Sequence, residues 1–391
     1  MSLPATSMQV RSIATAQPEG IIAQQDAARL AVQRCYLTED QKRLVPVLYR
    51  KAGVKSRGII LVEHHGPTGE DGNGLADAAA GGPVLGQPDE DVARFMPAAG
   101  DASFRGPTTA ARMLRYREES GRLALESAGS ALAASGLAAS DITHLVTVSC
   151  TGFAAPGVDI ALISGLGLPV TTARTHVGFM GCHGAINGLR AALAFARAEP
   201  GSNVLLCCVE ISSIHFFYGW DPEKWVANAL FADGSAAVVG TGMPTAQRVE
   251  STWKLAACGS CLIPDSQDAM SWHIGDHGFE MSLSSRVPSL ISERLPAWIE
   301  SWLGGMGLRV SDIASWAIHP GGPRIVLAVK QSLGLPEDST AASQAVLSRC
   351  GNMSSPTVLF IVQELMRRDA PRPCVALGFG PGLMAEAALF V

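Results

Sequence analysis

Apolar residues recur every three or four positions in two N-terminal segments, 26–36 and 38–51, and this spacing predicts two helices. The same spacing over residues 108–135 predicts a longer amphipathic helix that carries several arginines and glutamates. Residues 144–149 and 203–209 are almost continuously apolar and short, which indicates buried strands. Because predicted strands alternate with predicted helices, the pattern favours an α/β fold with helix-covered sheets.

This order of elements repeats along the chain at an offset of 170 or 171 residues. Several separate landmarks share this offset over a long stretch, which makes chance agreement a poor explanation. The matched pairs are 136–142 with 307–313, strand 144–149 with strand 316–319, the helix starts Gly181-Cys182 with Gly351-Asn352, and strand 203–209 with strand 373–379.

The repeat predicts a duplicated α/β unit whose halves pack about a pseudo-twofold axis. We assign residues 1–240 to the first half and residues 241–391 to the second. Cys182 and Asn352 would then stand at equivalent helix starts, and His319 would stand at the end of a strand in the second half. We expect the axis to bring these three side chains toward one centre.

Composition narrows the class of protein. Of the 391 residues, 47% are hydrophobic and 17% are charged, as in a compact globular enzyme. A net charge of −5 without a long run of lysines and arginines argues against nucleic-acid binding. Gly, Pro and Asp159 interrupt the apolar stretch 145–168, so we expect no membrane span, and the N-terminus lacks a secretory pattern.

The nine cysteines are odd in number and lie mostly in apolar stretches, which indicates reduced thiols and a cytoplasmic location. We expect no metal site. Cys258 and Cys261 have no second pair of ligands nearby, and no acidic or cysteine ligand is spaced to help His64 and His65. The His pair opens a Gly- and Pro-rich stretch, 64–107, that is typical of a long surface excursion.

Cys182 is the candidate nucleophile. It follows an extended segment and a glycine turn, and a helix is predicted directly after it. Unpaired N–H groups and the positive end of the helix dipole would favour its thiolate, so we expect a lowered pKa for this cysteine. The alternative is a small buried hydrophobic residue, the better interpretation for most of the other cysteines.

His319 and Asn352 complete a workable set. His319 can stabilise the thiolate and donate a hydrogen bond to a thioester oxygen. Asn352 is an uncharged donor that can hold the same oxygen without protonating a carbanion. The set therefore suits carbon–carbon bond formation between thioesters better than hydrolysis.

With these motifs the sequence resembles the type III polyketide synthases, the chalcone and stilbene synthase family of the thiolase-like superfold. The resemblance is good from Leu145 to the C-terminus and loose before it. It implies a duplicated αβαβα five-layer fold and a homodimer that acts on acyl-CoA and malonyl-CoA, without metal, cofactor or carrier protein. The matching motifs are Thr151-Gly152 with Pro156-Gly157, Gly181-Cys182, 229–234 (Ala-Leu-Phe-Ala-Asp-Gly), 319–323 (His-Pro-Gly-Gly-Pro), 351–355 (Gly-Asn-Met-Ser-Ser) and 377–383 (Leu-Gly-Phe-Gly-Pro-Gly-Leu).

The resemblance also implies residue roles. Cys182 would take the starter acyl group, and His319 and Asn352 would bind the malonyl thioester and stabilise the enolate formed on loss of carbon dioxide. The extended chain would then cyclise to a pyrone, resorcinol or chalcone-like product. Phe231 would be a gate between the CoA tunnel and the cavity. Ser354, Phe379 and Gly380 would line the cavity, and Lys51, Lys55 and Arg57 would bind the CoA phosphates.

The sequence departs from the plant enzymes at several positions. Met281 falls where they have a second gatekeeping phenylalanine, and Phe279 is close enough to substitute. His215 stands in a cavity wall that is often small or hydroxylic, and Ala155 replaces a methionine that crosses the dimer interface. Because these changes affect the cavity and not the reacting set, we expect the condensation to be kept, with a long acyl starter first and an aromatic one next.

Two alternatives remain open. One is an initiating ketoacyl-acyl-carrier-protein synthase, which uses the same three residue types but would need a basic patch for an acidic carrier. The other is an inactive thiolase-like scaffold subunit, which usually lacks the nucleophile that this chain retains.

Overall fold

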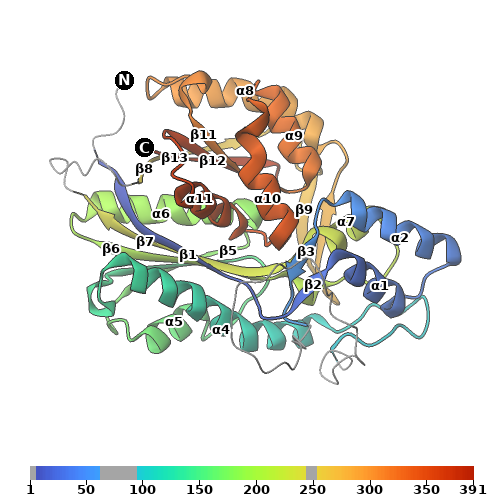
Figure 1. The fold of residues 1–391 in the computed structure, drawn as a ribbon. Helices are drawn as coiled ribbons and strands as arrows, with labels where there is room; N and C mark the ends of the chain where they lie inside the picture. Colours follow the sequence, from blue (N-terminus) through green and yellow to red (C-terminus); the bar gives the residue numbers. More distant parts are fainter. Residues whose placement is uncertain (1–5, 62–94, 244–252) are drawn as a thin grey trace, which may run out of the picture.

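A computed structural model describes residues 6–61, 95–243 and 253–391 of the chain. The His64-His65 pair and the expected surface excursion up to residue 94 lie outside the described residues. Nine strands form one hydrogen-bonded sheet in the order β11-β12-β13-β8-β1-β7-β6-β4-β5 (Figure 1). The expected α/β fold is confirmed.

The sheet contains the same arrangement of strands twice. The order β4-β6-β7-β1 of the first half matches the order β11-β12-β13-β8 of the second, β5 is an additional strand beside β4, and the two halves join where β1 pairs with β8. β4 and β11 start 171 residues apart (144 and 315), as do β6 and β12 (203 and 374). The strands are β1 (Met8–Ala16), β4 (His144–Ser149), β5 (Ala173–Gly178), β6 (Asn203–Ile211), β7 (Asp233–Gly242), β8 (Lys254–Leu262), β11 (Ser315–Ile318), β12 (Cys374–Gly380) and β13 (Met384–Phe390).

Helices cover both faces of each half of the sheet (Figure 1). Alternate residues of β6 show how: Leu205 and Val209 contact a core with α4 and α5, while Leu206 and Cys208 contact a core with α6 and α11. The second core also holds strands of the second half, and α8 and α9 cover that half from outside. The five expected layers are therefore present. The helices are α4 (Thr109–Ser135), α5 (Val158–Leu166), α6 (Gly184–Ala198), α8 (Val287–Gly304), α9 (Pro323–Ser332), α10 (Ala341–Cys350) and α11 (Thr357–Arg367).

A smaller unit packs beside the sheet. It contains α1 (Gln24–Arg34), α2 (Glu39–Lys51), α7 (Pro222–Leu230) and the paired strands β2 (Ile21–Ala23) and β3 (Ser56–Gly58). A hairpin of β9 (Met270–Gly275) and β10 (Gly278–Leu283) lies next to it (Figure 1). These two pieces supply much of the cavity wall described below.

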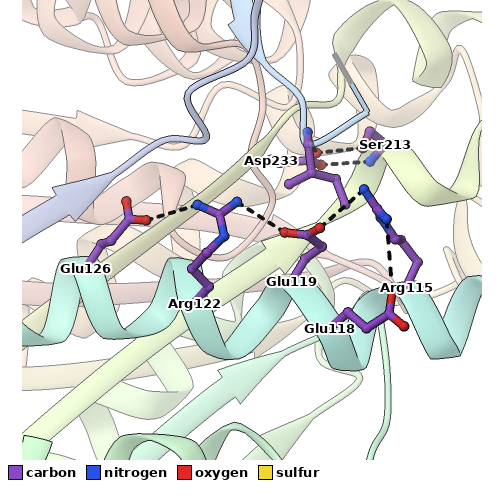
Figure 2. A network of polar contacts seen from close by, with 8 residues as sticks. Arg115, Glu118, Glu119, Arg122, Glu126, Ser213 and Asp233 are labelled. Carbon is purple, nitrogen blue, oxygen red and sulfur yellow. Dashed lines mark hydrogen bonds and ion pairs between the residues drawn. The ribbon is translucent and has the colours of Figure 1, made fainter. Parts of the chain in front are cut away.

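The predicted helix positions agree closely with the structure. α2 begins after Thr38, whose side chain caps the helix together with Gln41. α4 covers almost all of the predicted range, and on it Arg115 and Arg122 both form ion pairs with Glu119 (Figure 2). Our division of the chain at residue 240 remains a prediction: β7 ends at Gly242 and β8 begins at Lys254. None of the helices in the described ranges is both long and apolar enough to cross a membrane.

Candidate active site

Cys182 lies in the short 3-10 turn Gly181–His183 between β5 and α6, and its side chain is buried. Gly181 has φ +78°, and a Cβ there would lie 2.5 Å from Cδ of Pro381. Only glycine fits this turn without strain. The close approach of Pro381, in the turn between β12 and β13, thus fixes where the sulfur lies.

The expected lowering of the Cys182 pKa is wrong. Burial raises the pKa of this thiol to about 11, and hydrogen bonds from the side chains of Ser354 and Asn352 offset the shift only in part. A short turn precedes the helix, and the cost of desolvating a thiolate outweighs the local donors. In the resting site Cys182 is a thiol.

His319 follows the last residue of β11, and its N–H donates to the carbonyl of Leu377 at 2.8 Å. The imidazole is buried, and neither ring nitrogen has a hydrogen-bond partner among the described residues. Burial, and then the neighbouring His183, lower its pKa to about 3. His319 is therefore neutral at rest, with nitrogens free for a ligand.

The repeat predicted that a helix begins at Asn352, and this prediction is wrong. Asn352 forms a β-bridge with Phe231, and α11 begins only at Thr357. Its N–H donates to Leu230 O and its carbonyl accepts from Ala232 N, each at 2.9 Å. The side-chain Oδ1 accepts from Ser354 N at 2.8 Å, which leaves the amide NH₂ as the donor.

Cys182, His319 and Asn352 line one small cavity, as expected. A larger cavity of about 310 Å³ adjoins it, and Cys182, Phe231 and Met281 line both. The sulfur therefore stands at the junction of two compartments. The other residues of the small cavity are Ala227, Leu230, Met270, Leu283, Gly321, Ile325 and Phe379.

Met281, rather than Phe279, shares the junction with Phe231. Phe279 lines only the larger cavity and stacks on His215 with ring centroids 4.3 Å apart. His215 Nδ1 accepts from Phe279 N at 2.9 Å, and its Nε2 lies 2.6 Å from Thr151 O. Burial lowers the pKa of His215 to about 3, so it is a neutral wall residue whose two nitrogens are already bonded.

Ser354 lines the larger cavity and Phe379 the smaller one. Gly380 is not among the residues that line either cavity. A Cβ at this position would lie 2.4 Å from Cδ2 of His183, so Gly380 makes room for that imidazole.

The structure separates the three cations proposed for CoA. Lys51 and Lys55 are exposed, whereas Arg57 is buried and lines the larger cavity. The Arg57 guanidinium donates to the carbonyls of Asn228 and Phe231 at 2.8 and 2.9 Å. This arginine anchors the end of α7.

Arg105 is an exposed cation that the sequence reasoning did not single out, and it lines the larger cavity. Its sequence context, a Gly- and Pro-rich stretch, gave no signal that it stands by the mouth of a cavity.

Two buried carboxylates were also missed. Glu210 accepts hydrogen bonds from Cys150 N, Thr151 Oγ1 at 2.8 Å and Ser355 Oγ at 2.5 Å, and so ties both halves together beneath the site. A carboxylate inside the apolar strand 203–211 was the available signal.

Asp233 is the second missed carboxylate. It accepts from Ser213 N, Ser213 Oγ and Ile60 N at 2.6–2.8 Å (Figure 2). Burial raises its pKa to about 6. These bonds hold the start of β7 directly after Phe231.

Comparison with known proteins places this geometry in a family. Residues 102–244 match the model of the chalcone and stilbene synthases, N-terminal domain, and residues 254–391 match the C-terminal domain. The chain belongs to this family. Alpha-pyrone synthesis polyketide synthase-like Pks18 of Mycobacterium tuberculosis is 30% identical, covering 99% of this chain and 92% of the relative. The 1,3,6,8-tetrahydroxynaphthalene synthase of Streptomyces peucetius is also 30% identical, covering 97% and 92%.

Solved structures agree. The PKS-I crystal structure from the brown alga Ectocarpus siliculosus superposes with a TM-score of 0.83 at 28% identity, covering 98% of each chain. The C-terminal type III polyketide synthase domain of Steely1 from Dictyostelium has a TM-score of 0.82 at 24% identity, covering 98% and 99%, which supports the fold. The chain is a type III polyketide synthase, an acyltransferase with the thiolase-like fold, in a family that uses acyl-CoA and malonyl-CoA.

Proposed function

We propose that Cys182, His319 and Asn352 carry out decarboxylative condensation of malonyl-CoA onto a cysteine-bound acyl group. Cys182 Sγ displaces CoA from the starter and holds it as a thioester. The imidazole of His319 and the amide of Asn352 donate to the malonyl thioester oxygen. The observation that carries the proposal is the single cavity shared by these three side chains, where the His319 nitrogens have no partner among the described residues.

The step conserves atoms and charge. The malonyl carboxylate leaves as carbon dioxide, and its bonding electrons form an enolate whose oxygen the two donors hold. The enolate carbon attacks the acyl carbon, Cys182 leaves as a thiolate, and the lengthened chain remains on CoA. Transfer of that chain back to Cys182 allows another cycle.

The residues that line the small cavity favour survival of the enolate carbanion. Apart from the three reacting residues, its described lining residues are apolar or glycine, so no carboxylic acid or ammonium group stands there to protonate the enolate. Removing a carboxylate from water into such a compartment also favours its loss as neutral carbon dioxide.

We propose a long acyl starter, housed in the larger cavity. Among the described lining residues, Met96, Phe216, Trp272 and Phe279 form a largely apolar surface, and the volume of about 310 Å³ suits a flexible chain. Lys51, Lys55 and Arg105 are the exposed cations we assign to the CoA phosphates. The mycobacterial relative is named for alpha-pyrone synthesis, which makes a pyrone the first product to look for.

The direct test is turnover of malonyl-CoA with a panel of acyl-CoA starters, without carrier protein, read by mass spectrometry. We expect extended products from long-chain starters. Cys182→Ala should abolish acyl loading and product, whereas Cys350→Ala, a buried cysteine outside both cavities, should keep them. Product formation by Cys182→Ala, or a strict need for acyl carrier protein, would refute the proposal and favour a ketoacyl synthase.

We also propose a homodimer in a reducing, cytoplasmic setting. β5 is one of the two outer strands of the sheet, and large apolar side chains near it are exposed: Phe153 (45%), Ile160 (38%) and Met180 (44%). Pairing of such an edge with a second copy covers both the strand and these side chains. All nine cysteines are free, which supports a reducing compartment.

A further inference from the structure

His183, the residue after the nucleophile, has no role in the condensation described above. Its side chain is 3% exposed and lines neither cavity. Nδ1 lies 2.7 Å from Asn187 Oδ1, while Nε2 is buried without a partner among the described residues. A buried imidazole with one unpaired ring nitrogen is uncommon in proteins, so the unpaired Nε2 of His183 needs an explanation.

The hydrogen bonds around Asn187 determine where the His183 proton lies. Asn187 Nδ2 donates to Glu386 Oε1 at 3.2 Å, and a carboxylate oxygen only accepts. The opposite end of the amide, Oδ1, therefore faces His183 and accepts from it. The His183 proton is on Nδ1, and Nε2 carries a lone pair.

The Glu386 carboxylate places a negative charge at the far end of the hydrogen bonds that start at His183. It is 2% exposed, forms an ion pair with Arg190, and accepts from Ser260 Oγ at 2.5 Å. A polar chain thus runs from His183 through Asn187 to Glu386 and Arg190. It crosses the interior between α6 and β13, two elements that otherwise contact each other through apolar residues.

His183 and His319 meet at the same place on β12: Ile318 pairs with Leu377, so His319 comes next to Gly378, and a Cβ added to Gly378 would lie 3.2 Å from Cβ of His183. The His319 N–H donates to Leu377 O, and a Cβ added to Gly380 would lie 2.7 Å from His183 Nε2. A positive charge on His183 would lower the pKa of His319. Glycine at position 380 is what allows the His183 ring to occupy this place.

We propose that His183 is a positioning residue for His319: its bare Nε2 accepts, directly or through one water, the hydrogen bond of the His319 imidazolium that forms when Cys182 gives up its proton. This inference rests on the proposed function, since it needs Cys182 as nucleophile and His319 as its base.

The proton balance is simple. The thiol proton moves from Sγ of Cys182 to one ring nitrogen of His319, which leaves a thiolate and an imidazolium. One N–H of the imidazolium faces the thiolate, and the other needs an acceptor in a buried site. His183 Nε2 supplies it, and the chain through Asn187 to the Glu386 carboxylate stabilises the added positive charge.

The charged and titratable groups around His183 determine whether it takes up a proton of its own. Glu386 from β13 favours positive charge, whereas Arg190 from α6 and a protonated His319 disfavour a second charge on His183 itself. Cys258 from β8 lies near the same ion pair, and burial raises the pKa of its thiol to about 12, so it stays neutral. The pair of imidazoles therefore accepts one proton and not two, which keeps His183 an acceptor.

The test is the pH dependence of Cys182 alkylation by iodoacetamide in the full-length protein, followed peptide by peptide with mass spectrometry. His183→Phe keeps a ring but removes the acceptor, whereas His183→Gln keeps an acceptor oxygen. His144→Phe is the matched control, because His144 is another buried histidine that contacts α6, stacked on Phe195, away from the site.

We expect His183→Phe to raise the pH midpoint of alkylation by about one unit and to slow it about tenfold at pH 7. His183→Gln should stay within about threefold of the unmodified chain, and His144→Phe should match it. A His183→Phe profile that superposes on the original would overturn the proposal. So would equal losses in the Phe and Gln variants together with lowered melting temperatures, since these would show a packing role. If Cys182 is not the fastest-alkylated cysteine in the unmodified protein, the proposed function fails instead.

Discussion

At the scale of single residues, the reacting groups are uncharged at rest. The Cys182 pKa of about 11 and the His319 pKa of about 3 mean that a thiol and a neutral imidazole meet in a buried site. A preformed ion pair there would have to overcome the desolvation of both charges. Activation therefore depends on proton transfer within the site, and on neighbours that stabilise its product.

Asn352 provides a direct test of enolate stabilisation. We expect Asn352→Ala to lower malonyl-CoA decarboxylation about 100-fold or more, because one preformed donor to the developing oxyanion is lost. Loading of an acyl group on Cys182 should remain measurable. The assay compares carbon dioxide release with acyl-enzyme formation by mass spectrometry.

Asn352→Asp is the matched variant, since it keeps the side-chain shape but replaces the donor by a negative charge. It should be at least as impaired as the alanine variant. Unchanged decarboxylation in either variant would contradict the role given to Asn352.

The raised pKa of Asp233 predicts that the free energy of unfolding depends on pH. Burial raises its pKa from 3.8 to about 6, so the folded protein binds more protons than the unfolded chain between these values. Its contribution to stability is full below pH 4 and is lost as the pH rises through 6. The slope attributable to this residue is at most about −1.4 kcal/mol per pH unit.

Urea unfolding of the unmodified protein and of Asp233→Asn from pH 4 to 7.5 measures this slope. The variant should show a flatter dependence in that window, whatever its absolute stability. Parallel curves for the two proteins would show that Asp233 is already ionised in the folded state at low pH.

At the scale of elements, the junction between α7 and β7 sets the shape of the site. Phe231 ends α7, bridges Asn352 and stands between the two cavities. The Arg57 guanidinium, from β3, donates a hydrogen bond to the Phe231 carbonyl. One short segment therefore places Phe231 at the junction of the two cavities and fixes the backbone of Asn352.

We predict that Arg57→Met lowers the free energy of unfolding by about 2–4 kcal/mol, because two buried carbonyls lose their donor. It should also change the distribution of product chain lengths, since Phe231 is no longer held in place. Arg50→Met, at an exposed position on α2, is the control and should leave stability within about 0.5 kcal/mol. Denaturant unfolding and product analysis give the two readouts.

If Arg57→Met instead raises the KM for acyl-CoA with stability unchanged, the guanidinium binds the CoA phosphates, as the sequence resemblance first implied. Identical behaviour of the Arg57 and Arg50 variants would contradict the anchoring role.

At the scale of the whole molecule, the duplication explains why residues so distant in sequence meet. β4 with β6 and β11 with β12 are parallel pairs in matching places, and both halves pack on the same central helices α6 and α11. Cys182 precedes one central helix and Asn352 lies shortly before the other. Their meeting is a property of the paired halves, not of either half alone.

The edge strand β5 and the exposed apolar side chains near it predict that the protein forms a dimer. We expect Ile160→Asp to shift a dimer toward monomer in sedimentation velocity, because a charge would be buried in the contact. Leu327→Asp is the control and should change nothing, since Leu327 is 45% exposed on α9, which covers the other half of the sheet. A monomeric unmodified protein, or a dimer indifferent to Ile160→Asp, would contradict this interface.

The sequence by itself determined the alternation of strands and helices and the duplication, and it pointed to the three side chains that share the small cavity, because periodicity and offset are local properties that a single chain displays. It also predicted the cavity role of Phe231 and Met281, through resemblance. Tertiary structure alone decided the protonation of the site, since burial of Cys182 and His319 outweighs the local helix dipole. It also decided that Arg57 anchors a carbonyl, that Asn352 bridges a strand instead of opening a helix, and that His183 stands beside His319. Such contacts depend on which distant groups share a dry interior, and no spacing along the chain records that.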